Sequence, residues 1–102
     1  MDVHKIIITG RAEKDLQSIW RYIADDLLEP NTADNLLDRI DEGILTLKTM
    51  PGRNKLVNDE RLARRGIRPL HIENYTVFYT VGEKTVNIIR VLYSHRDWQN
   101  LL

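Results

Sequence analysis

Two segments in the first half of the chain have the hydrophobic spacing of amphipathic helices. Their apolar residues recur every three or four positions, at Ala12, Leu16, Ile19, Trp20, Ile23 and Leu27, and then at Ala33, Leu36, Leu37, Ile40, Ile44 and Leu47. Thr9 is a suitable N-cap for the first helix, and Pro30 suits the first turn of the second. The connection between them is short, so the pattern predicts an antiparallel helix hairpin whose outer face is polar.

Four segments rich in β-branched and aromatic residues predict strands, at residues 3–9, 67–72, 75–81 and 85–93. Residues 73–74 and 82–84 are short enough to be hairpin turns. Pro69 cannot donate to a β-ladder, so its strand should lie at the edge of the sheet. The predicted fold is therefore α+β: an N-terminal strand and an antiparallel helix hairpin packed on a mainly antiparallel four-stranded sheet. A short helical turn at the C-terminus should dock Trp98 and its neighbours on the body.

Helices on one side would leave the other face of the sheet open. Strict alternation along the last strand places Ile88, Arg90 and Leu92 on one face. The segment 53–65, a loop with about one helical turn, leads into the edge strand, while residues 93–97 follow the last strand. We therefore expect a basic cleft between these two segments, edged with Tyr, His and Arg side chains.

Composition supports one globular domain spanning residues 1–102. Hydrophobic residues make up 42% of the chain and charged residues 29%. The chain contains no cysteine, which excludes disulfides and thiolate metal sites. The sequence shows neither a membrane-spanning run nor a signal-peptide core, so we expect a cytoplasmic protein without cofactor or metal.

The zero net charge conceals an asymmetry between the two halves of the chain. Residues 53–68 contain 6 basic and 2 acidic residues. The basic ones are candidate contacts to nucleic acid or another target: Arg53, Lys55, Arg61, Arg64, Arg65 and Arg68. The alternative interpretation is a solvated loop.

Residues 93–97, Tyr-Ser-His-Arg-Asp, place groups suited to proton transfer and phosphate binding side by side. They could equally form a surface turn. Arg90, inside an apolar strand, is expected to pair with an acid. His4 and His71 have no companion at metal-ligand spacing and are expected to be ordinary strand residues.

The segments "RAEKDLQSIWRYIADDLLEP", "NYTVFYTV" and "IIRVLYSHRDWQNLL", taken in this order, resemble the RelE/ParE superfamily of type II toxin–antitoxin toxins. The resemblance covers essentially the whole chain and implies the same fold. It also implies a growth-inhibiting toxin that a cognate antitoxin protein holds inactive.

The resemblance leaves two mechanisms open. RelE-like members cut mRNA on the ribosome by attack of a 2′-hydroxyl, and here Tyr93, His95, Arg96 and Arg68 would be catalytic. Where many such enzymes carry an arginine in the "NYTVFYTV" strand, this chain has Thr76. ParE-like members inhibit DNA gyrase by binding, without catalysis of their own. A non-toxic protein-interaction module is a third interpretation.

Overall fold

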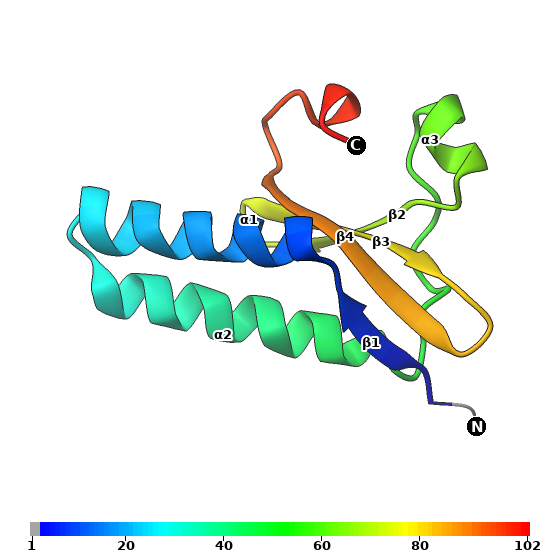
Figure 1. The fold of residues 1–102 in the computed structure, drawn as a ribbon, viewed down its shortest axis with the longest axis horizontal. Helices are drawn as coiled ribbons and strands as arrows, with labels where there is room; N and C mark the ends of the chain where they lie inside the picture. The colour runs from blue at the N-terminus through cyan, green and yellow to red at the C-terminus, as the bar shows by residue number, and fades with distance from the viewer. Residues whose placement is uncertain (1–2) are drawn as a thin grey trace.

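The computed structural model describes residues 3–102 (Figure 1). The strands are β1 (Lys5–Ile8), β2 (Arg68–Ile72), β3 (Tyr75–Val81) and β4 (Thr85–Tyr93). The helices are α1 (Gly10–Arg21), which a π-helical turn continues to Asp26, α2 (Pro30–Thr46) and the short α3 (Glu60–Arg64). A 3-10 turn (Trp98–Asn100) ends the chain. The predicted order of elements and the predicted α+β class are confirmed.

The four strands form one sheet in the order β1-β4-β3-β2. β1 runs parallel to β4, whereas β3 runs antiparallel to both β4 and β2. The sheet is thus mainly antiparallel, as predicted, and β2 with its Pro69 is an edge strand.

The helix hairpin covers one face of the sheet (Figure 1). Buried side chains of α1 and α2 pack there against one side of β3 and β4, including Val77, Tyr79 and Ile88. Thr9 caps α1: its hydroxyl accepts from the Ala12 N–H and donates to the Ile88 carbonyl, 2.8 Å away. Gly43 lies where α2 crosses β2, and a Cβ at this position would collide with the Ile72 side chain.

The opposite face of the sheet is partly covered as well. Phe78 and Leu92 form a second buried cluster there with Val57, Leu62 and Ile67 from the connection between α2 and β2. The C-terminal tail closes this cluster, with the rings of Phe78 and Trp98 centred 5.1 Å apart. The predicted docking of the tail is confirmed, and α3 and the tail leave only part of this face open.

A register shift changes which residues of β4 share a face. Phe78 lies opposite Arg90, but the next residue, Tyr79, lies opposite Ile88, so Ile89 is an extra residue in β4. The expectation that Ile88, Arg90 and Leu92 share a face is therefore wrong. Ile88 and Val91 pack under the helices, whereas Leu92 belongs to the cluster on the other face.

Arg90 joins three parts of the molecule. Its Nε and Nη2 atoms donate to the two carboxylate oxygens of Asp15 in α1, at 2.7 and 3.0 Å. Its Nη1 donates to the Leu101 carbonyl in the tail at 2.7 Å. The hydrogen bond to Asp15 raises the pKa of Arg90, and burial opposes that rise. The expected pairing of Arg90 with an acid is confirmed.

Asp15 also accepts a hydrogen bond from a β4 amide that has no neighbouring strand to pair with. The pairing of β1 with β4 ends at Ile88, and beyond it the Val91 N–H donates to Asp15 Oδ2 at 3.0 Å. Asp15 therefore satisfies both a buried cation and an unpaired strand amide. We refer to this arrangement of Asp15, Arg90 and the Leu101 carbonyl as the α1–β4–tail clamp.

Substituting Asp15→Ala should lower the free energy of unfolding by about 3 kcal/mol, because it leaves Arg90 largely buried without a counter-ion. Glu60→Ala is the matched control, since it removes the acid of an exposed ion pair with Arg64. It should cost less than about 0.5 kcal/mol. Urea denaturation measures both values, and equal losses for the two variants would contradict the role of the clamp.

Tyr79→Phe should cost about 1–2 kcal/mol, because the buried Tyr79 hydroxyl donates to the Pro51 carbonyl at 2.8 Å and accepts from Asn54 Nδ2 at 3.0 Å. These bonds hold the start of the loop that follows α2. Tyr75→Phe is the control, with an expected change below about 0.5 kcal/mol. Thermal unfolding compares the two, and a loss for Tyr79→Phe no larger than the control's would refute the assignment.

Candidate functional site

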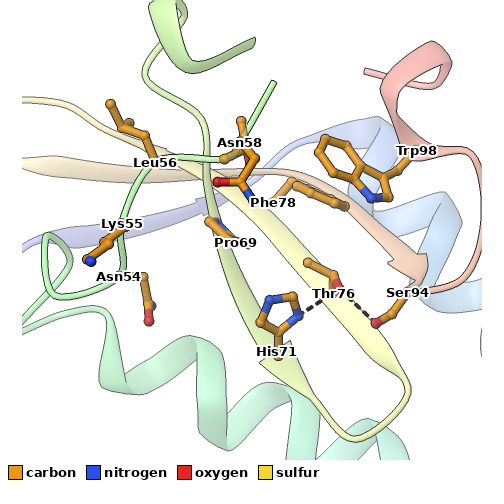
Figure 2. A pocket seen from close by; sticks show the side chains of 11 residues that line it. Asn54, Lys55, Leu56, Asn58, Pro69, His71, Thr76, Phe78, Ser94 and Trp98 are labelled. Atoms are coloured by element: carbon orange, nitrogen blue, oxygen red, sulfur yellow. Dashed lines mark hydrogen bonds between the residues drawn. The ribbon is translucent and has the colours of Figure 1, made fainter. Parts of the chain in front are cut away.

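A cleft of about 390 Å³ opens on the sheet face that points away from the helix hairpin (Figure 2). One wall is the loop at residues 54–58, and the other is formed by Ser94 and Trp98 after β4. His71 of β2 and Thr76 of β3 lie on its floor, beside the buried Phe78. We call this space the open-face cleft.

Three side chains along the open-face cleft form a hydrogen-bonded chain (Figure 2). His71 Nδ1 lies 3.0 Å from Thr76 Oγ1, which lies 2.8 Å from Ser94 Oγ. Thr76 is buried, whereas His71 is exposed. A hydroxyl has one proton and two lone pairs, so Thr76 donates to at most one of these two neighbours.

The hydrogen-bonded chain was not predicted from the sequence, in which His71 was interpreted as an ordinary strand residue. Its members are far apart in sequence terms but adjacent in the sheet. The two-residue turn after β2 places Ile72 opposite Tyr75 and His71 opposite Thr76. Hairpin register was thus the signal that could have paired His71 with Thr76.

The open-face cleft lies between the two segments that the sequence singled out, but its expected lining is wrong. Tyr93, His95 and Arg96 do not line it, and Lys55 is its basic residue. Tyr93 instead lies opposite Tyr75, with ring centroids 5.8 Å apart. Since neighbouring residues of a strand point to opposite faces, Tyr93 faces away from the cleft that Leu92 and Phe78 underlie.

The four predicted catalytic residues are not all brought together, because Arg68 lies apart from the other three. The rings of Tyr93 and His95 are 5.2 Å apart, and Tyr93 and Arg96 both border a second groove beside α1. Arg68 lies opposite Tyr79 of β3, whereas Tyr93 lies opposite Tyr75 of the same strand. Tyr75 and Tyr79 are four residues apart, a separation of roughly 13 Å along β3. Arg68 donates to the Asn54 carbonyl and so holds the loop of the open-face cleft.

The other predicted target-binding cations mostly have partners within the fold. Arg61 and Arg65 of the α3 region donate to tail carbonyls, of Gln99 at 3.4 Å and of Leu102 at 2.8 Å. Arg64 pairs with Glu60 at 2.7 Å, and Arg53 donates to the Thr46 hydroxyl at 3.0 Å. Together with Lys55 at the cleft, these residues are spread over several surfaces, and their contact with nucleic acid stays a prediction.

Within residues 3–102, no group of three or more His, Cys, Asp or Glu side chains is placed to hold a metal ion. In the same part of the chain, no helix has the length and apolar character needed to cross a membrane.

Comparison with known proteins gives a consistent assignment. A profile of the family described as "ParE toxin of type II toxin-antitoxin system, parDE" matches residues 6–98. No curated protein matches the chain.

The fold is shared with several solved structures, including the following two. The chromosomal ParDE toxin–antitoxin system from P. aeruginosa has a TM-score of 0.74 at 22% identity, over 89% of this chain and 96% of that one. The toxin–antitoxin complex RelBE2 from Mycobacterium tuberculosis has a TM-score of 0.66 at 20% identity, over 89% of this chain and 98% of that one. The resemblance to the RelE/ParE superfamily is thus confirmed.

The family match extends from β1 to the tail turn at Trp98 and so includes both helices, the sheet and residues 93–97. The protein belongs to the ParE toxin family of type II toxin–antitoxin systems.

Proposed function

We propose that this toxin inhibits DNA gyrase in the cytoplasm by binding to it, without RNA cleavage of its own, and that a cognate antitoxin neutralises it. The observation that supports binding rather than catalysis is the separation of Arg68 from Tyr93, His95 and Arg96. RNA cleavage by a 2′-hydroxyl needs a base, an acid and a cation within hydrogen-bond reach of one phosphate. Arg68 is committed to a loop carbonyl instead.

A second candidate function is ribosome-dependent mRNA cleavage, and one observation favours it. The open-face cleft holds an exposed histidine in a chain of hydroxyl groups, with Lys55 on the same rim. Under this alternative His71 would transfer protons and Lys55 would contact the RNA backbone. The chain belongs to the ParE family, and Arg68 lies apart from the other predicted catalytic residues. For these two reasons gyrase inhibition remains the preferred proposal.

Induction of the toxin in growing cells should leave transcripts intact while a reporter plasmid loses negative supercoils and the chromosome breaks. Transcript ends are mapped across the transcriptome in the same cultures. The variants His71→Gln and Lys55→Ala should keep full toxicity, because inhibition without RNA cleavage gives the proton-transfer and RNA-contacting groups of the open-face cleft no chemical role.

Cleavage inside translated codons, abolished by His71→Gln, would replace the proposal with the second candidate. Unimpaired growth with neither effect would leave only a protein-interaction module. Circular dichroism of each purified variant verifies that a loss of toxicity does not reflect unfolding.

The antitoxin is proposed to dock at the free edge of β1. β1 is the edge strand at the other end of the sheet from β2, and Ile7 and Ile8 on it are each 40% exposed. Beside it, a groove of about 770 Å³ is lined partly by Val3, Leu45 and Lys48. An unpaired edge with exposed apolar side chains is suited to the addition of a strand from another protein.

Ile7→Lys should therefore leave toxicity intact but reduce neutralisation about tenfold or more when the cognate antitoxin is co-expressed. Leu28→Lys, at the exposed tip of the helix hairpin, is the control and should be neutralised normally. Growth curves over a range of antitoxin induction give the measurement. Equal neutralisation of both variants would place the docking site elsewhere.

A further inference from the structure

A second groove, of about 650 Å³, lies between α1 and the ends of β3 and β4. Three tyrosines from three different elements line it: Tyr22 after α1, Tyr75 in β3 and Tyr93 in β4. Arg96, Ser18 and Asp15 complete its polar lining. Ile19 and Val91 are among its apolar walls. We call it the tyrosine groove.

The tyrosine groove is rich in hydrogen-bond donors. Burial raises the pKa of Tyr75, and the neighbouring Tyr22 and Tyr93 hydroxyls raise it further. The Tyr75 and Tyr93 rings are centred 5.8 Å apart, and a Tyr75 phenol with a raised pKa is a neutral O–H donor at physiological pH. Within residues 3–102, neither these hydroxyls nor the Arg96 guanidinium forms a side-chain hydrogen bond to a protein acceptor.

The one carboxylate in the tyrosine groove is already occupied. Asp15 receives two hydrogen bonds from Arg90 and a third from the Val91 N–H. The groove therefore presents a guanidinium and several hydroxyls to a ligand but no free anionic acceptor. A carboxylate suits these donors best, because a hydrogen bond from a guanidinium to an ionised acceptor is stronger than one to a neutral acceptor.

The apolar part of the tyrosine groove favours a protein ligand over a nucleic-acid backbone. Tyr22 and Tyr93 are about half exposed, at 53% and 42%, so their rings are available for contact. Exposed tyrosines beside an arginine are typical of the anchor residues of protein interfaces. A nucleic-acid backbone is bound mainly by several Lys and Arg side chains, whereas this groove has one free guanidinium among apolar walls.

We propose that the tyrosine groove binds an acidic segment of a partner protein, in which a carboxylate contacts Arg96 and the tyrosine hydroxyls while an adjacent apolar side chain packs against Ile19 and Val91. The groove is separate from the open-face cleft and from the β1 edge, because its lining shares no residue with either. Failure of the gyrase proposal would leave this inference unaffected.

The test uses two hexapeptides as probes, one that alternates glutamate with leucine and one with glutamine in place of each glutamate. Each is titrated into the whole toxin while backbone and tyrosine-ring NMR signals are recorded. The acidic peptide should shift signals of Tyr22, Tyr75, Tyr93 and Arg96. The glutamine peptide should bind at least about tenfold more weakly, because a hydrogen bond to a charged group contributes more than one to a neutral group.

Matched variants separate the groove from general charge. Arg96→Gln and the double change Tyr75→Phe with Tyr93→Phe should each weaken binding of the acidic peptide about tenfold. Arg64→Gln removes the same charge from an exposed helix turn elsewhere and should leave binding unchanged. Each variant's spectrum shows whether it has kept the fold.

Four results would overturn the proposal. They are equal binding of the two peptides, equal effects of Arg96→Gln and Arg64→Gln, shifts confined to the open-face cleft, and no saturable binding. A hexanucleotide of deoxythymidine that shifts the same tyrosine signals at lower concentration than the acidic peptide would likewise overturn it in favour of a phosphate ligand.

Discussion

The ion pair between Asp15 and Arg90 is the interaction on which the arrangement of the rest of the structure depends. β1 covers only the first half of β4, and α1 takes its place along the second half. At that point Asp15 binds both the Arg90 side chain and the Val91 amide, so a helix continues the hydrogen bonding that a strand would have supplied. Arg90 extends the same link to the tail through the Leu101 carbonyl. Each ion is more than four-fifths buried, and so neither can lose its partner at low cost.

The open-face cleft and the tyrosine groove meet at the end of β4. The extra residue Ile89 inverts the alternation there, so that Val91 and Tyr93 face α1 whereas Leu92 faces the second core. Ser94, directly after the strand, borders the open-face cleft, while Tyr93 borders the tyrosine groove. A short segment thus supplies walls to two sites on opposite sides of the sheet. This explains why Tyr93 and Ser94, adjacent in sequence, border different sites.

Periodicity was sufficient for much of the fold. The two helices, the three later strands, the hairpin turns and the edge position of Pro69 follow from local spacing and from the chemistry of single residues. The bulge at Ile89 could not be predicted, because it depends on how Phe78 and Tyr79 pair with another strand. The partner of Arg90 lies 75 residues away in sequence and belongs to a helix, so spacing could only indicate that some acid would be needed.

The candidate site was harder to predict than the fold for a related reason. A run of basic residues appears as one surface in the sequence, but α3 turns Arg61 and Arg65 toward the tail and Arg64 toward Glu60. His71 appeared isolated because its companions lie across strands. The resemblance to toxins supplied the family, whereas the positions of functional groups required tertiary contacts.

Amide hydrogen exchange in the Asp15→Asn variant would test most directly whether the α1–β4–tail clamp organises this fold. The account predicts that the Val91 amide and the tail amides of Leu101 and Leu102 lose protection together, because one carboxylate holds Arg90 and Val91 while Arg90 holds the tail. Amides that pair β2 with β3 should keep the protection of the unmodified protein. Loss of protection at Val91 with an unchanged tail, or a uniform loss across the sheet, would contradict the account.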